Sequence, residues 1–144
     1  NAAIFINNDF IKHGNSLLTT LNPNIIERVN VEKGSFNIEG VDYSGKILID
    51  LKADYTPNII TLNSLISKHL SLENNPIILQ IDGTYINQNF KEYCVDENYI
   101  LKINASKVNT SKGNKIHLIQ LVTKSAKNLE NAQKPKQIII RGTN

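Results

Sequence analysis

The sequence predicts an α+β fold made of two similar small units, each a mixed sheet with short helices on one face. Three observations support this prediction. Strand-forming blocks recur in the same order at offsets of 72 to 75 residues, an amphipathic segment lies between the two sets, and 40% of the 144 residues are hydrophobic. A chain of this length buries enough surface for a core without disulfide bonds. Its single cysteine, Cys94, excludes an internal disulfide.

The repeated blocks are a tight hairpin, a polar helix start followed by an alternating strand, and a second apolar strand. The three pairs are, in order, Ala3–Ile11 with Pro76–Ile86, Leu21–Val31 with Val95–Ala105, and Gly45–Lys52 with His117–Lys124. We interpret the conserved order as a duplication. Residues 3–52 are therefore expected to superpose on residues 76–124.

A helix is predicted between the units, over Thr61–Leu72. Its apolar residues share one helical face: Leu62, Leu65, Ile66 and Leu70. Thr61 suits the N-cap position, and Pro57 favours a break before it. We accordingly divide the chain into a first unit (1–56), a linking helix (57–75) and a second unit (76–144).

The remaining segments are polar or lie at the end of the chain. Ser35–Tyr43 and Lys107–Lys115 occupy equivalent places in the two units and are interpreted as mobile loops. Lys124–Lys136 is a polar stretch, and Gln137–Arg141 predicts a short final strand. Strand alternation predicts a core formed by ten residues: Ile26, Val29, Ile47, Ile49, Ile78, Ile81, Ile100, Ile103, Leu118 and Leu121.

Charge is distributed unevenly along the chain. Residues 1–101 hold 7 basic and 12 acidic residues, whereas residues 102–144 hold 9 basic residues and one acidic residue, Glu130. The basic segment has no aromatic residue, so it lacks the stacking surface of a single-strand nucleic-acid binder. No apolar run approaches the ~20 residues that span a bilayer. We expect neither a nucleic-acid partner nor a transmembrane segment.

Conventional catalysis has no support in the sequence. His13, His69 and His117 are scattered without metal-ligand spacing, and His117 is expected on an exposed strand face. The acidic neighbours of Cys94 oppose thiolate formation, which favours a structural cysteine. Asp82 precedes a glycine and suits a turn. We expect no catalytic residue, cofactor or metal.

Two stretches resemble the plug domain of TonB-dependent outer-membrane receptors. Asn22–Gly34 (NPNIIERVNVEKG), followed by Gly45–Ile49 (GKILI), is similar to the family's P-x-x-I-E-x-I-x-V-x-K-G stretch and its G-V-I-x-I-x-T-K ending. The second set contributes Pro76–Gly83 (PIILQIDG), similar to P-L-x-x-I-D-G, and the ending Val122–Lys124. The chain resembles two partial tandem plug copies, and its 144 residues include no barrel sequence.

The resemblance implies a duplicated plug-like architecture in the envelope of a Gram-negative bacterium. It implies a non-enzymatic periplasmic protein that occupies, gates or docks on an outer-membrane β-barrel, either a transporter or a protein-secretion pore. The alternative is an excised regulatory or signalling module of a larger membrane protein, which binds a small ligand or peptide. An enzyme is the least supported class. Because the chain begins at Asn1 and contains no Met, we expect a cleaved signal peptide or an excised domain.

A barrel mouth filled with water offers mainly polar, charged and edge-strand contacts. The basic segment supplies the expected partner-binding residues: Lys107, Lys112, Lys115, Lys124, Lys127, Lys134, Lys136 and Arg141. Among Ile77–Ile81, Ile116–Val122 and Ile138–Ile140, at least one strand is expected at a sheet edge, where it could pair with a partner.

Overall fold

A computed structural model describes residues 1–133 of the chain. Its first unit contains β1 (Ala2–Ile6), β2 (Asp9–Ile11), η1 (Gly14–Ser16), α1 (Leu17–Thr20), η2 (Pro23–Ile25), β3 (Ile26–Ile38) and β4 (Val41–Leu51). A connecting segment holds β5 (Ile59–Thr61) and α2 (Leu62–His69). The second unit contains β6 (Ile77–Ile81), β7 (Thr84–Tyr85), η3 (Phe90–Glu92), β8 (Cys94–Asp96), η4 (Glu97–Tyr99), β9 (Ile100–Asn109), β10 (Lys115–Thr123) and α3 (Ala126–Gln133).

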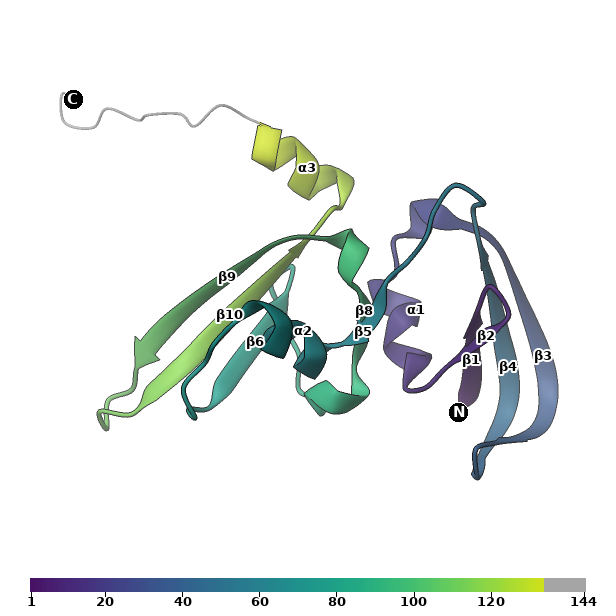
Figure 1. Cartoon of the computed structure of the whole chain (residues 1–144), viewed down its shortest axis with the longest axis horizontal. Coiled ribbons are helices and arrows are strands. Elements are labelled where there is room, and N and C mark those ends of the chain that lie inside the picture. Colours follow the sequence, from purple (N-terminus) through teal and green to yellow (C-terminus); the bar gives the residue numbers. More distant parts are fainter. Residues whose placement is uncertain (134–144) are drawn as a thin grey trace.

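The two units repeat one sheet topology. Over residues 1–133, the strand orders are β2-β1-β4-β3 in the first sheet and β7-β6-β10-β9 in the second. In each sheet the two central strands run parallel and the outer strands pair with them antiparallel. In Figure 1 the two sheets lie on either side of α1 and of the segment that contains β5 and β8. The predicted α+β fold of two similar mixed-sheet units is confirmed.

The tight hairpin of each unit is closed in the same way. Its first turn residue, Asn7 or Asp82, has a positive φ (49° and 48°), a conformation that Asn and Asp tolerate better than most residues. The side-chain oxygen of Asn7 accepts a hydrogen bond from the backbone N–H of Leu51 (2.9 Å). Asp82 accepts the equivalent bond from the N–H of Thr123 (3.0 Å). Side chains at equivalent positions therefore fix the turn to the central strand in both units.

The short helices begin where the sequence predicts. Asn22 and Asp96 cap η2 and η4, and each side chain accepts a hydrogen bond from the N–H two residues later. The Thr61 side chain accepts a bond from the N–H of Ser64 (3.1 Å) and caps α2. The predicted linking helix is present, although α2 ends at His69.

A two-stranded ribbon, β5 with β8, lies between the two cores. Side chains on its strands alternate between the cores. Ile59 and Cys94 pack into the first core, whereas Ile60 and Val95 pack into the second. The first core is built on Ile4, Ile6, Leu17, Leu21, Ile25, Ile49 and Leu51. The second is built on Leu62, Leu65, Ile66, Leu79, Tyr93, Ile119 and Leu121.

The interpretation of two polar segments as loops was wrong for the first segment, and for the second it holds only for the turn at residues 110–114. β3 continues to Ile38 and β4 begins at Val41, so Ser35–Tyr43 is mostly strand. The equivalent segment Lys107–Lys115 contains the end of β9 and the start of β10. Ladder hydrogen bonds form in both segments, and in the first one Tyr43 packs its ring against Phe10 and Phe36 lies under the ammonium group of Lys46. The predicted strand Gln137–Arg141 lies outside the described residues.

The predicted core is correct at some positions and shifted at others. Ile49 and Leu121 are buried, and Ile26, Ile47, Ile81, Ile100, Ile103 and Leu118 are half-buried. The prediction was wrong for Val29 and Ile78, because 51% and 40% of their surfaces are exposed. Ile78 pairs with Leu118 on the outer face of its sheet, and the neighbouring Leu79 and Ile119 fill the core instead.

Candidate functional site

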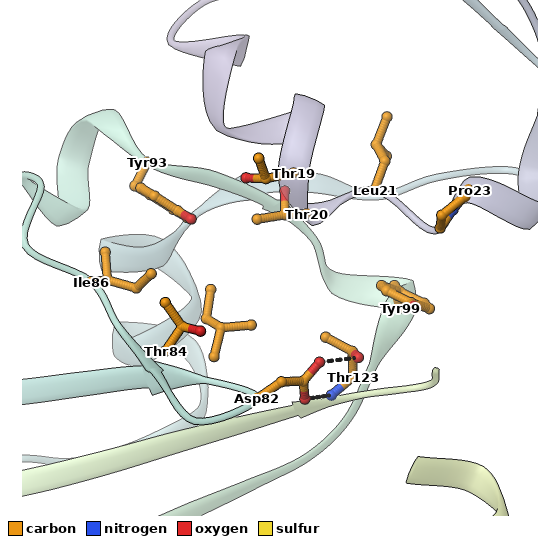
Figure 2. A pocket seen from close by; sticks show the side chains of 11 residues that line it. Thr19, Thr20, Leu21, Pro23, Asp82, Thr84, Ile86, Tyr93, Tyr99 and Thr123 are labelled. Carbon is orange, nitrogen blue, oxygen red and sulfur yellow. Dashed lines mark hydrogen bonds between the residues drawn. The ribbon is translucent and has the colours of Figure 1, made fainter. Parts of the chain in front are cut away.

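A cavity of about 330 Å³ lies between the two units. Figure 2 shows Thr19, Thr20 and Tyr93 on one side and Asp82, Thr84 and Thr123 on the other. The first two threonines come from α1, whereas Asp82 and Thr84 come from the β6–β7 turn and strand. The cavity therefore lies where α1 and the residues after it face the hairpin of the second unit.

Hydroxyl groups and one carboxylate dominate the polar lining of this cavity. The Asp82 carboxylate accepts hydrogen bonds from the Thr123 hydroxyl (2.6 Å) and from the Asn128 side-chain amide (2.9 Å), besides the Thr123 N–H. Burial raises the pKa of Tyr93, and a hydrogen bond with Thr19 opposes this effect. At neutral pH the phenol is therefore uncharged, and the cavity offers hydroxyl groups and the Asp82 carboxylate as hydrogen-bonding groups for a small polar ligand.

The predicted basic residues do not form one surface. Lys112 lies in the β9–β10 turn and Lys115 begins β10, whereas Lys124 and Lys127 lie beyond the other end of β10. A strand rises about 3.3 Å per residue, so β10 separates the two groups by about 25 Å. The turn and α3 lie at opposite ends of β10 in Figure 1. Lys134, Lys136 and Arg141 lie outside the described residues.

Lys107 has a structural role in addition to its charge. Its Nζ donates to Glu73 Oε1 (2.7 Å), and this contact holds the segment after α2 against β9. The hydrogen bond and the charge of Lys107 lower the pKa of Glu73. Lys112, Lys115, Lys124 and Lys127 form no ion pair within residues 1–133 and are exposed.

A second cluster of charges connects α2 to η4. Glu97 accepts from Lys68 Nζ (2.8 Å) and lies 2.6 Å from His69 Nε2. The hydrogen bonds from Lys68 and His69, in that order, lower the pKa of Glu97. These contacts join the connecting segment to the second unit. In the described part of the chain, no three His, Cys, Asp or Glu side chains are arranged to hold a metal ion.

Cys94 and Asp96 are buried at the boundary between the units. The Cys94 N–H donates to Ser16 Oγ, which donates to the Cys94 carbonyl (2.8 Å each). Burial raises the pKa of the Cys94 thiol, which keeps it in the unreactive thiol form. Asp96 accepts hydrogen bonds from the Tyr55 hydroxyl and from the N–H of Asn58 (2.9 Å). Cys94 therefore joins β8 to η1, and Asp96 joins β8 to the residues that precede β5.

His117 does not lie on an exposed face as expected. It is 3% exposed, and its Nε2 has no hydrogen-bond partner among residues 1–133. Its position on β10 is equivalent to Gly45 on β4, so the two units differ here.

No helix within residues 1–133 is long and apolar enough to cross a membrane.

Sequence reasoning did not identify the cavity between the units. Its lining comes from α1, β7, β10 and the segment around Tyr93, and no local spacing connects these segments.

In comparisons with known proteins, no family model matches the chain, and no curated protein or solved structure matches it.

Proposed function

We propose that this chain is a non-enzymatic, plug-like interaction protein that docks on the periplasmic side of an outer-membrane β-barrel, as the resemblance to receptor plugs implies. One observation carries this proposal. The stretch with the strongest resemblance, Asn22–Gly34 followed by Gly45–Ile49, forms a single hairpin of β3 and β4 preceded by a capped turn. Its counterpart in the second unit forms β9 and β10 in the same topology.

The described basic residues give this proposal two separable contact surfaces. Lys112 and Lys115 form the hairpin-end surface, whereas Lys124 and Lys127 form the helix-end surface. Exposed charges at the rim of an interface act mainly on the association rate and its salt dependence. Added salt screens such charges, with a Debye length of about 8 Å at physiological ionic strength.

The test is association of the purified chain with native outer-membrane vesicles, followed by cross-linking and mass spectrometry to identify the bound protein. The variants K112E/K115E and K124E/K127E carry the same change of charge at opposite ends of β10. We expect one pair to slow association at low salt more than the other, with an intact fold by circular dichroism. If the chain cross-links to no barrel protein, or if both pairs associate like the wild type at low and high salt, the proposal is wrong.

The cavity between the units favours a second candidate function, a module that binds a small ligand or peptide. Its volume of about 330 Å³ lies at the low end of the range of about 300–1,000 Å³ for ligand sites. The hydroxyl-rich lining suits a compact polar ligand. A panel of short peptides and monosaccharides can be screened by NMR shift perturbation, with Thr84→Val as the cavity variant and the exposed Thr56→Val as its control. Shifts that avoid the cavity, or that persist in Thr84→Val, contradict this function.

A further inference from the structure

The outer edge of β3 is long and open. Within residues 1–133, β3 ends its sheet, and no further strand pairs with its outer side. It extends over 13 residues, with register shifts between Ile26 and Arg28 and between Lys33 and Phe36, and residues 27–35 are all exposed. Figure 1 shows β3 on the side of the first sheet that faces away from the second unit. An open edge of this length is a template for pairing with another chain.

The open edge also carries uncovered apolar side chains. Val29 pairs with Ile49 and Val31 pairs with Ile47, so both valines lie on the face that packs into the first core. Their exposed fractions are nevertheless 51% and 65%. In the second unit, the position equivalent to Val29 is Ile103, which packs against the core that contains α2. The valines therefore have apolar surface that the described part of the chain does not cover.

The residues of β3 are complementary to the same residues read in reverse. Around Asn30, an antiparallel copy places Glu27 opposite Lys33, Arg28 opposite Glu32, and Val29 opposite Val31. Opposite charges and β-branched side chains at facing positions stabilise strand pairs. β9 lacks this property: around Asn104, Lys102 faces Ser106 and Lys107 faces Leu101.

We propose that two copies of this chain form a dimer by antiparallel pairing of their β3 strands, with Asn30 on the two-fold axis. The sheet then continues through both copies. Arg28 Nε already donates to Asp50 on β4 (3.3 Å), and Glu32 lies opposite Lys46 in the register of β3 and β4. The dimer joins these pairs into a row of alternating charge, namely Asp50 and Arg28 of one copy, then Glu32 and Lys46 of the other.

The same pairing closes the apolar face. Ile49 and Val29 of one copy meet Val31 and Ile47 of the other in a single apolar row. A two-fold interface uses the same surface on both copies and is closed, so the dimer removes both β3 edges without forming a filament. A single strand pair is small beside the ~800 Å² per partner of a standard interface. Dimerisation should therefore depend on concentration.

The first test is sedimentation equilibrium of the full chain over a wide concentration range. Glu27→Lys or Lys33→Glu alone creates two like-charge pairs per dimer and should raise the dimer dissociation constant roughly ten-fold. The double variant E27K/K33E restores opposite charges and should restore dimerisation. Lys102→Glu, on the edge strand of the other unit, is the matched control and should dimerise like the wild type. A wild-type chain that stays monomeric throughout, or a double variant as weak as the single variants, overturns the proposal.

The second test fixes the register. Facing residues in an antiparallel pair have Cα atoms about 4.5–5.5 Å apart, which permits a disulfide. Asn30→Cys should therefore form a covalent dimer on mild oxidation. Asn104→Cys, at the equivalent position on β9, should not, and the native Cys94 is buried. Equal cross-linking of the two variants, or none by Asn30→Cys, is incompatible with the proposed axis.

Discussion

Replacing Asp82 by Ala should destabilise the protein by about 3 kcal/mol. The Thr123 N–H and hydroxyl both donate to the Asp82 carboxylate, and Thr123 is buried. A buried donor that loses its partner costs about 1 kcal/mol or more, so two donors contribute about 2 kcal/mol. Asp82 also has a φ of 48°, and an Ala in this left-handed region costs about 1 kcal/mol.

Asn7→Ala is the matched variant in the first unit. It has the same left-handed conformation, with a φ of 49°, but loses only the bond from the Leu51 N–H. Its expected cost is about 2 kcal/mol. Asp82→Asn keeps the acceptor for the Thr123 N–H and should cost less than about 1 kcal/mol.

Urea unfolding followed by circular dichroism measures all three variants, and unchanged m-values would show that the midpoints report stability. The reasoning fails if Asn7→Ala and Asp82→Ala are equally destabilised, because the extra bonds of Asp82 would then contribute nothing. It also fails if Asp82→Asn is as unstable as Asp82→Ala.

Three further predictions concern the core and its buried titratable groups. Ile119→Ala should lower the free energy of unfolding by about 2–5 kcal/mol, because Ile119 is fully buried. Ile78→Ala, on the outer face of the same sheet, should lower it by less than about 1 kcal/mol. Equal urea midpoints for the two variants would refute the assigned faces. Burial, followed by the hydrogen bond to Asp96, raises the pKa of Tyr55 from its usual 10.0. The folded state then keeps a proton that the unfolded state loses, so stability should fall as pH rises above 10. The decrease in unfolding free energy per pH unit should be smaller in Tyr55→Phe than in the wild type. The decrease that remains should come from Tyr93, whose pKa is also raised. An identical decrease in the two proteins contradicts the assignment. Cys94 should react with a thiol reagent only after urea is added, and rapid labelling of the folded chain would show that it is accessible.

The repeat could be predicted because its signals are local. Turn residues such as Asn7 and Asp82, caps such as Thr61, and alternating apolar residues all act within a few positions of the chain. Burial was harder to predict, because it depends on what covers a face. Val29 alternates like a core residue but lies on an edge strand, and His117 is covered by segments distant in sequence.

The candidate site was predicted less well than the fold. The basic residues were treated as one segment, but the length of β10 places Lys115 and Lys124 at its opposite ends. Ser35–Tyr43 was interpreted as a loop because it has no continuous apolar run, yet it pairs as strand through backbone hydrogen bonds, which do not depend on such a run. The cavity between the units depends on how the two sheets meet, which no repeat within a unit encodes.

The ribbon of β5 and β8 determines how the chain can unfold. Since Cys94 completes the first core and Ile59 packs beside it, while Ile60 and Val95 belong to the second, neither unit has a full complement of side chains by itself. A fragment that contains only residues 1–56 would lack Ile59 and Cys94, so apolar surface of the first core would be exposed. Unfolding of one unit therefore removes packing contacts from the core of the other. Although the two units share one sheet topology, the molecule should unfold in a single cooperative transition rather than in two successive steps.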